Sequence, residues 1–256
     1  MDNFYSLYFF IFGALVGSFL NVVILRLPFQ KDLVVSRSSC PLCGNQLKWY
    51  HNIPLISFIG LKGKCAFCAS PISWRYPLIE CLTGLIALWL MPMSLNLESI
   101  GFFLFFFIIA CAFICHFFID LDHHLILDSI NIYLLATILS FSIVMFSWQH
   151  WLIGGLIGFG VPLLVTWIFY KIRGQIGLGG GDIKLYGILG LYLGPGGIMF
   201  TIFLSCFVGA VWGLGLIAFK KLTKDKPMAF GPAILLVASL QIFFPELSQR
   251  IQYLLF

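Results

Sequence analysis

The stretch SINIYLLATILSFSIVMFSWQHWLIGGLIGFGVPLLVTWIFY, residues 129–170, decides the class of fold because its 42 residues carry no formal charge. A helix crosses a bilayer with about 20 apolar residues, so this stretch predicts two membrane spans that turn near Trp148-Gln149-His150. The whole chain agrees, since 61% of its 256 residues are hydrophobic and only 10% are charged. Soluble domains carry about 25% charged residues, so the composition excludes a soluble globule. It also excludes a disordered chain.

Outward from this stretch, further apolar runs predict six more spans. They are residues 4–25, 78–93, 101–119, the two parts of 185–219 on either side of Gly194-Pro195-Gly196-Gly197, and 227–244. The first run lacks the basic start and small-residue cleavage site of a signal peptide, so we expect it to be retained as a span. The sequence therefore predicts an all-α polytopic membrane protein with about eight transmembrane helices. We expect a first transmembrane helix over 1–25, a small polar domain over 26–77 and a membrane core of about seven helices over 78–256.

Basic residues predict which way the chain faces. Of the 15 Lys and Arg residues, 14 lie within 26–77, around 171–184 or within 220–226. Eight spans place these three regions on one side of the membrane, which the positive-inside rule makes the cytoplasmic side. This bias accounts for the net charge of +5. We therefore expect a lipid bilayer and no nucleic acid as a partner.

The polar domain carries two cysteine pairs, Cys40-Pro-Leu-Cys43 and Cys65-Ala-Phe-Cys68. Two such knuckles supply four thiolates, the tetrahedral set of a closed structural Zn²⁺ site. Two disulfides or a redox dithiol are the alternatives, but thiols on a cytoplasmic face stay reduced. A domain of about 50 residues has little core of its own, so a metal would explain how it folds. The other four cysteines lie in apolar runs and are expected to be small buried hydrophobes.

Two aspartates at the predicted membrane edge are the candidates for chemistry. Asp120 follows nineteen uncharged residues, and Asp182 follows the glycine-rich stretch Gly177-Leu178-Gly179-Gly180-Gly181. Ionisable groups at such depth are costly and are usually functional. The helix dipole favours an ionised Asp182 at a helix start, whereas Asp120 meets the opposite dipole and an apolar wall. If the two side chains meet, they can share a proton as an aspartic protease pair does.

Other interpretations of the acidic segment stay open at this stage. Asp122 and Asp128 can cap the helix that starts near Ser129 or lie in a solvated turn. Adjacent His123 and His124 favour interfacial side chains over metal ligands, although a metal-dependent hydrolase would use Asp120, Asp122 and the two histidines. A transporter is disfavoured because transport sites lie near the bilayer midplane. The alternative from another class is a non-enzymatic membrane scaffold whose zinc-binding domain docks a partner.

Several ordered motifs resemble one known family. They are Gly17-Ser-Phe-Leu-Asn-Val-Val-Ile-Leu-Arg-Leu-Pro28, the two cysteine pairs with Asn52-Ile-Pro-Leu-Ile-Ser57 between them, Tyr76-Pro-Leu-Ile-Glu80, Gly179-Gly-Gly-Asp-Ile-Lys-Leu185 and Phe230-Gly-Pro232. The chain resembles the type IV prepilin peptidases, which are bifunctional leader peptidase/N-methyltransferases of type IV pilus and type II secretion systems. One departure is Leu127, where the family has a proline.

The resemblance implies that Asp120 and Asp182 are the catalytic aspartates of a GxGD aspartic protease in a bacterial inner membrane. It implies cleavage of the basic leader of prepilins or pseudopilins after a Gly, on the cytoplasmic side. It further implies methylation of the new N-terminal amine with S-adenosylmethionine. The residues themselves give no chemical argument for a methyl-donor site; Glu80, a lone acid at a span edge, is the one candidate.

Overall fold

The computed structural model describes residues 2–33, 38–175, 177–218 and 228–255, without the side chains of residues 2, 3, 254 and 255. Long helices dominate these ranges, and no strand longer than an isolated bridge forms within them. The all-α fold class is thereby confirmed. The chain forms two compact units, Met1–Cys115 and His116–Phe256, and the boundary falls inside helix α4 (Leu97–His123).

In the first unit, α1 (Asp2–Arg26) packs along α3 (Arg75–Trp89). Both are apolar helices, and small residues allow them to approach closely. A side chain on Gly13 would come within 2.5 Å of the Thr83 carbonyl oxygen, and one on Gly17 would collide with the Thr83 hydroxyl. Gly13 and Gly17 are four residues apart, so they share the face of α1 that meets α3.

Aromatic rings join the first part of α4 to these two helices. Phe9 of α1 packs edge-on against Phe103 at 5.0 Å between ring centroids, and Phe103 stacks on Phe107 at 5.4 Å. Ala87 of α3 completes this buried cluster. Between α1 and α3, the residues that the structure describes form only short helical turns: η1 (Leu27–Phe29), η2 (Trp49–Asn52) and α2 (Ile56–Gly60).

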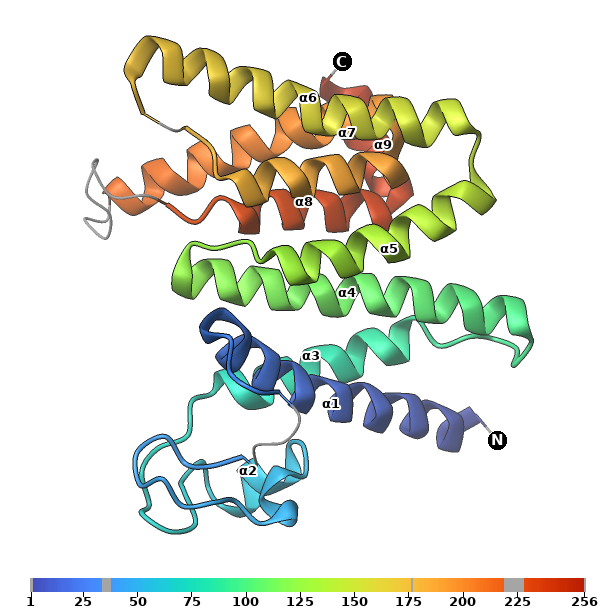
Figure 1. The fold of residues 1–256 in the computed structure, drawn as a ribbon. Helices are drawn as coiled ribbons and strands as arrows, with labels where there is room; N and C mark the ends of the chain where they lie inside the picture. The colour runs from blue at the N-terminus through green and yellow to red at the C-terminus, as the bar shows by residue number, and fades with distance from the viewer. Residues whose placement is uncertain (1, 34–37, 176, 219–227, 256) are drawn as a thin grey trace. The chain divides into compact units, whose positions relative to one another are not determined.

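The second unit is arranged around α7 (Gly180–Ala218). Its neighbours are α5 (Asp128–Met145), α6 (Trp148–Arg173) and α8 (Gly231–Phe243), which Figure 1 shows running alongside it. Glycines again set the distance between helices. Gly154 of α6 lies against Gly190 of α7, leaving no room for a side chain on either.

Gly194 interrupts α7, where the sequence predicted a break between two spans. Its φ of 67° and ψ of −177° are not helical, and glycine is the residue that takes such a positive φ without steric cost. The imidazole of His150 fills the space beside it, with Nε2 3.1 Å from the Tyr192 carbonyl oxygen. The predicted turn between α5 and α6 was two residues late, because α5 ends at Met145 and α6 already begins at Trp148.

The structure does not confirm the count of eight spans. Among the described residues, five helices are long and apolar enough to cross a membrane, or six if the bent pair of α8 and α9 (Pro245–Leu255) forms one span. With 15 residues, α3 is shorter than the usual span of about 20. The sequence analysis missed α9, an amphipathic helix that turns by 108° from α8. The last predicted basic loop, 220–226, and Arg37 lie outside the described residues.

Candidate functional site

Asp120 lies in the last turn of α4, as expected, and is buried with 4% of its surface exposed. Its Oδ2 accepts a hydrogen bond from the backbone N–H of Gly231 over 2.9 Å. Gly231 is the first residue of α8, and the first N–H groups of a helix have no partner within the helix. The Asp120 carboxylate therefore satisfies the start of a helix that is remote in sequence.

Asp182 lies in the first turn of α7, directly after the glycine-rich stretch, which confirms that this stretch opens a helix. Its side chain is buried with 9% of its surface exposed. No described residue forms a hydrogen bond with Oδ1 of this carboxylate. A buried oxygen without a hydrogen-bond partner is energetically costly. Oδ1 of Asp182 is therefore available to accept a hydrogen bond from a group that is not part of the chain.

Ile126, in the connection between α4 and α5, links the two aspartate positions. A side chain on Gly181 would lie 2.7 Å from Cβ of Ile126, and one on Gly231 would lie 2.8 Å from its Cδ1. The two carboxylates are close enough for a charge on Asp120 to act on Asp182. The structure thus brings the two predicted carboxylates together, and adds Gly231 and Ile126, whose contacts with them no sequence spacing could reveal.

The other acids of the segment take different places. The prediction that Asp128 caps a helix is wrong: Leu127 is the N-cap residue of α5, and the Asp128 carboxylate forms an ion pair of 2.8 Å with Nζ of Lys184. Both partners are exposed, at 62% and 51%. Asp122 and His124 are exposed too. Among the described residues, only the cysteines form a metal-binding cluster, so the acids and histidines give no such site.

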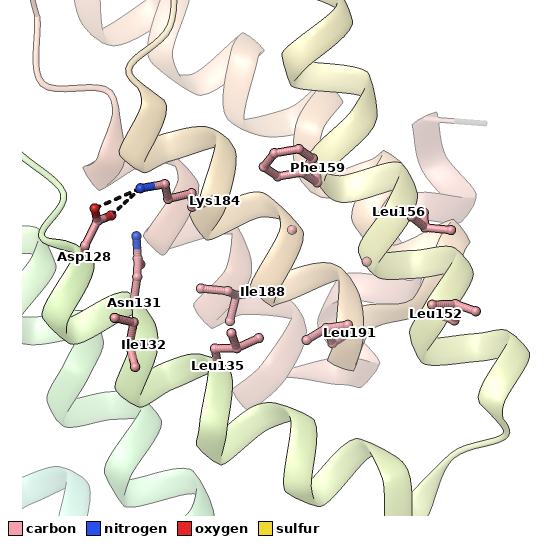
Figure 2. Close-up of a pocket in the computed structure, with 12 residues that line it drawn as sticks. Asp128, Asn131, Ile132, Leu135, Leu152, Leu156, Phe159, Lys184, Ile188 and Leu191 are labelled. Atoms are coloured by element: carbon pink, nitrogen blue, oxygen red, sulfur yellow. Dashed lines mark hydrogen bonds and ion pairs between the residues drawn. The ribbon is translucent and has the colours of Figure 1, made fainter.

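Asn131 of α5 contacts the glycine-rich turn. Its side chain is buried, and its Nδ2 lies 3.5 Å from the carbonyl oxygen of Gly181. Asn131 also lines a groove of about 510 Å³ between α5, α6 and α7. Figure 2 shows the Asp128–Lys184 pair at one end of this groove, with apolar side chains such as Leu135 along the rest. Neither Asp120 nor Asp182 lines the groove, so it lies beside the aspartates and does not contain them.

The four predicted metal ligands converge in the first unit. The sulfur atoms of Cys40, Cys43, Cys65 and Cys68 all lie within 4.8 Å of one another, and all four cysteines are free. Cys40 and Cys68 are 3.9 Å apart between sulfur atoms. Tetrahedral Zn²⁺ with Zn–S distances of about 2.3 Å needs a separation near 3.8 Å between sulfurs. The donor set therefore fits a thiophilic metal, and it excludes two disulfides in this structure.

The two knuckles share one backbone pattern. Cys40 N–H donates to the Asn45 carbonyl and Gly44 N–H donates to Cys40, and residues 65, 69 and 70 repeat this arrangement. Gly44 takes a φ of 72°, and Ala69 takes the same place in the second knuckle with a φ of 56°. The backbone N–H groups of Cys43 and Leu42 lower the pKa of Cys40 to about 6. A thiolate is the form that binds a metal.

Comparisons with known proteins cover most of the chain. Residues 11–93 match the bacterial peptidase A24 N-terminal domain, and residues 105–214 match the type IV leader peptidase family. A prepilin leader peptidase/N-methyltransferase of Aeromonas hydrophila is 34% identical over 94% of this chain and 91% of the relative. One from Stutzerimonas stutzeri is 35% identical over 87% of this chain and 84% of the relative. No solved structure matches the chain.

Proposed function

Because the chain belongs to the type IV leader peptidase family, we propose that it is a membrane aspartic endopeptidase that cleaves the leader from type IV prepilins or pseudopilins after a Gly. The observation that supports this proposal most directly is the meeting of Asp120 and Asp182 around Gly231 and Ile126. Membership in a family of enzymes does not support the alternative of a non-enzymatic scaffold.

In the proposed mechanism, one carboxylate is charged and the other is protonated. The N–H of Gly231 donates to Oδ2 of Asp120 and so favours its negatively charged form. The backbone of Gly179 acts on Asp182 in the same sense, but Oδ1 of Asp182 is buried without a hydrogen-bond partner among the described residues, which disfavours its charged form. We therefore assign Asp120 as the base and Asp182 as the acid, the reverse of what the helix dipoles alone suggest. Asp120 takes a proton from water, the resulting hydroxide attacks the scissile carbonyl carbon, and Asp182 protonates the carbonyl oxygen. When the tetrahedral intermediate collapses, the C–N bond breaks, one hydroxyl of the intermediate returns its proton to Asp182 as the carbonyl re-forms, and the proton held by Asp120 passes to the leaving amine.

The protein is a multi-pass membrane protein, and we propose that it lies in a bacterial inner membrane with the aspartates toward the cytoplasm. Asp120 is at the end of α4 and Asp182 is at the start of α7, so both belong to helix ends and not to the middle of a span. Lys171, Arg173 and Lys184 lie near the same ends of α6 and α7. A basic leader would stay on that side of the membrane by the positive-inside rule.

We propose a structural Zn²⁺ ion on Cys40, Cys43, Cys65 and Cys68, because four converging thiolates form a closed site with no position left for a substrate. The ion would hold residues 26–77 together, a segment in which the described residues between α1 and α3 form only short helical turns. In this role Zn²⁺ contributes to folding and takes no part in peptide cleavage.

We also propose that the chain methylates the new N-terminal amine of the product. The relatives carry this activity in their name, and the aspartates lie in the second unit, which leaves the first unit for methyl transfer. S-adenosylmethionine supplies the methyl group when bound. Oε2 of Glu80, the sequence candidate for a contact with this donor, accepts the N–H of Leu55 over 2.8 Å.

The test is a single assay with two products. Purified protein in liposomes is incubated with a membrane-inserted peptide that carries a basic leader, a Gly and an apolar helix, with and without S-adenosylmethionine. Mass spectrometry of the product reports both loss of the leader and gain of a methyl group. We expect cleavage in both conditions and methylation only with the donor. An intact, correctly inserted peptide would contradict the peptidase assignment, and a cleaved but unmethylated product would contradict the methyltransferase assignment alone.

A further inference from the structure

Leu55 has an unusual backbone conformation for a residue with a side chain. Its φ is 61° and its ψ is −48°, and the N–H of Ile56 donates to the carbonyl oxygen of Pro54 over 2.6 Å. A hydrogen bond between residues two apart, around a centre with positive φ, is the rare and strained form of γ-turn. Residues with side chains avoid this region, so the surrounding structure must hold Leu55 there.

Glu80 holds this turn from another part of the chain. Its Oε2 accepts the N–H of Leu55 over 2.8 Å, and 8% of its surface is exposed. The hydroxyl of Ser18 in α1 also interacts with this carboxylate. Burial lowers the local dielectric and so strengthens such a hydrogen bond. The carboxylate thus joins three segments: α1, the turn between the cysteine pairs, and α3.

A second contact fixes the two helices at the same place. Nδ2 of Asn21 in α1 donates to the carbonyl oxygen of Tyr76 in α3 over 3.2 Å. Gly17, one residue before Ser18, has its face directly against Glu80, since an added side chain would lie 2.8 Å from the Glu80 Cα. Neither helix can shift along the other without disturbing Glu80. The position of the carboxylate, and with it the position of Leu55, is therefore set by the helix pair.

Backbone strain of this kind persists at sites where function requires an otherwise unfavourable geometry. The strained turn lies midway between the two cysteine pairs and belongs to the first unit, which contains neither aspartate. Resting on the proposed methyltransferase activity, we infer that Glu80 is a positioning residue for methyl transfer: it clamps the γ-turn at Leu55 and thereby holds residues 52–57 in the conformation that this reaction needs. Peptide cleavage in the second unit does not depend on the clamp.

The experiment compares four variants of the full-length protein with the wild type in liposomes. Glu80→Leu removes the acceptor, and Glu80→Gln keeps a carbonyl oxygen that can accept the Leu55 N–H. In Leu55→Gly/Glu80→Leu, glycine adopts the turn without strain and needs no clamp. Thr83→Val is the matched control, because valine keeps the shape of the buried threonine at the contact of α1 and α3, and among the described residues the Thr83 hydroxyl bonds only to the carbonyl oxygens of Ile79 and Glu80 in its own helix.

Two readouts are measured: cleavage and methylation of one peptide, and hydrogen–deuterium exchange of residues 52–60. For Glu80→Leu we expect methylation to fall on the order of tenfold or more, with cleavage within about twofold of wild type and faster exchange in 52–60. Glu80→Gln and Thr83→Val should resemble the wild type. The double variant should regain most of the methylation lost in Glu80→Leu.

Unchanged exchange and methylation in Glu80→Leu would overturn the clamp. Equal loss in Glu80→Gln and Glu80→Leu would also overturn it, because the charge and not the hydrogen bond would then matter. If Leu55→Gly/Glu80→Leu methylated as poorly as Glu80→Leu, holding the strained turn would not be the role of Glu80 in methyl transfer. Should the wild type cleave but never methylate, the proposed methyltransferase activity fails, while the exchange data still decide whether Glu80 holds Leu55.

Discussion

The carboxylate of Asp120 accepts a hydrogen bond of 2.9 Å from the backbone N–H of Gly231, 111 residues further along the chain. This contact ties the end of α4 to the start of α8. It leaves Gly231 so close that an added side chain would lie 2.7 Å from Asp120 Oδ2. The position of the Asp120 carboxylate therefore depends on Gly231 having no side chain.

Gly231→Ala should abolish most peptide cleavage while the protein still inserts and folds. The new methyl group would displace the Asp120 carboxylate or the start of α8, and mispositioned general acid–base catalysis costs about 10²–10⁴-fold in rate. The measurement is the cleavage rate in liposomes. Gly160→Ala in α6 is the control, because nothing lies within 4 Å of the added group, and it should cleave at the wild-type rate.

Two neighbouring glycines before Asp182 should respond differently to the same substitution. A side chain on Gly181 would lie 2.8 Å from the carbonyl oxygen of Ile126, so Gly181→Ala should push Asp182 away from Asp120 and lower cleavage at least about tenfold. A side chain on Gly180 meets nothing within 4 Å, so Gly180→Ala should remain active. Equal activity of the two variants would argue against the role of Ile126 as the contact between the aspartate positions.

The ion pair of Asp128 and Lys184 should contribute little to stability or to catalysis. Both side chains are more than half exposed, and exposed pairs contribute about 0.2–1 kcal/mol. Asp128→Asn should therefore change the free energy of unfolding by less than about 1 kcal/mol and leave cleavage within about threefold. Thermal unfolding in detergent and the cleavage rate check this. A loss as large as that of Asp120→Asn would mean that Asp128 contacts the substrate or the reacting water.

Much of this architecture could be predicted from the sequence because it follows from composition and local spacing. Charge-free runs locate the long helices, the glycine-rich stretch opens α7, and two CxxC pairs point to one metal site. The contacts that complete the site could not be predicted, since they join distant segments. In two of these contacts, the backbone N–H of Gly231 donates to Asp120 and that of Leu55 donates to Glu80. Every residue except proline has such an N–H, so the residue type does not reveal which one donates.

Errors in the sequence prediction came from features with two equally good local explanations. Asp128 has the residue type and place of an N-cap, but the helix begins one residue earlier than predicted, with Leu127 as its N-cap, and the Asp128 carboxylate pairs with Lys184. Helix α9 was not predicted, because membrane spans were inferred from unbroken apolar runs and α9 is short and amphipathic. The number of spans could not be predicted for a similar reason, because an apolar run need not be one membrane crossing. Helix α3 has only 15 residues, and the 39 residues of α7 are interrupted at Gly194.

Loss of one cysteine ligand should remove the metal and loosen only the segment that the metal holds. We expect wild-type protein to bind one Zn²⁺ per chain and Cys40→Ser to bind it far more weakly, with residues 26–77 becoming sensitive to protease. Elemental analysis and limited proteolysis measure the two effects. Cys206→Ser, an exposed cysteine of α7, is the control and should keep the metal. Full metal content in Cys40→Ser would contradict the four-cysteine site.

The most direct test of the central claim is peptide cleavage by Asp120→Asn, Asp182→Asn and Asp122→Asn, measured against the wild type with the same inserted substrate. Asparagine keeps the shape of the side chain and removes its acid–base chemistry, so folding should be preserved. We predict that Asp120→Asn and Asp182→Asn abolish cleavage, because the two carboxylates interact in one buried site, and that the exposed Asp122 is dispensable. Activity retained in either of the first two variants, or lost in Asp122→Asn, would contradict the assignment of the catalytic pair.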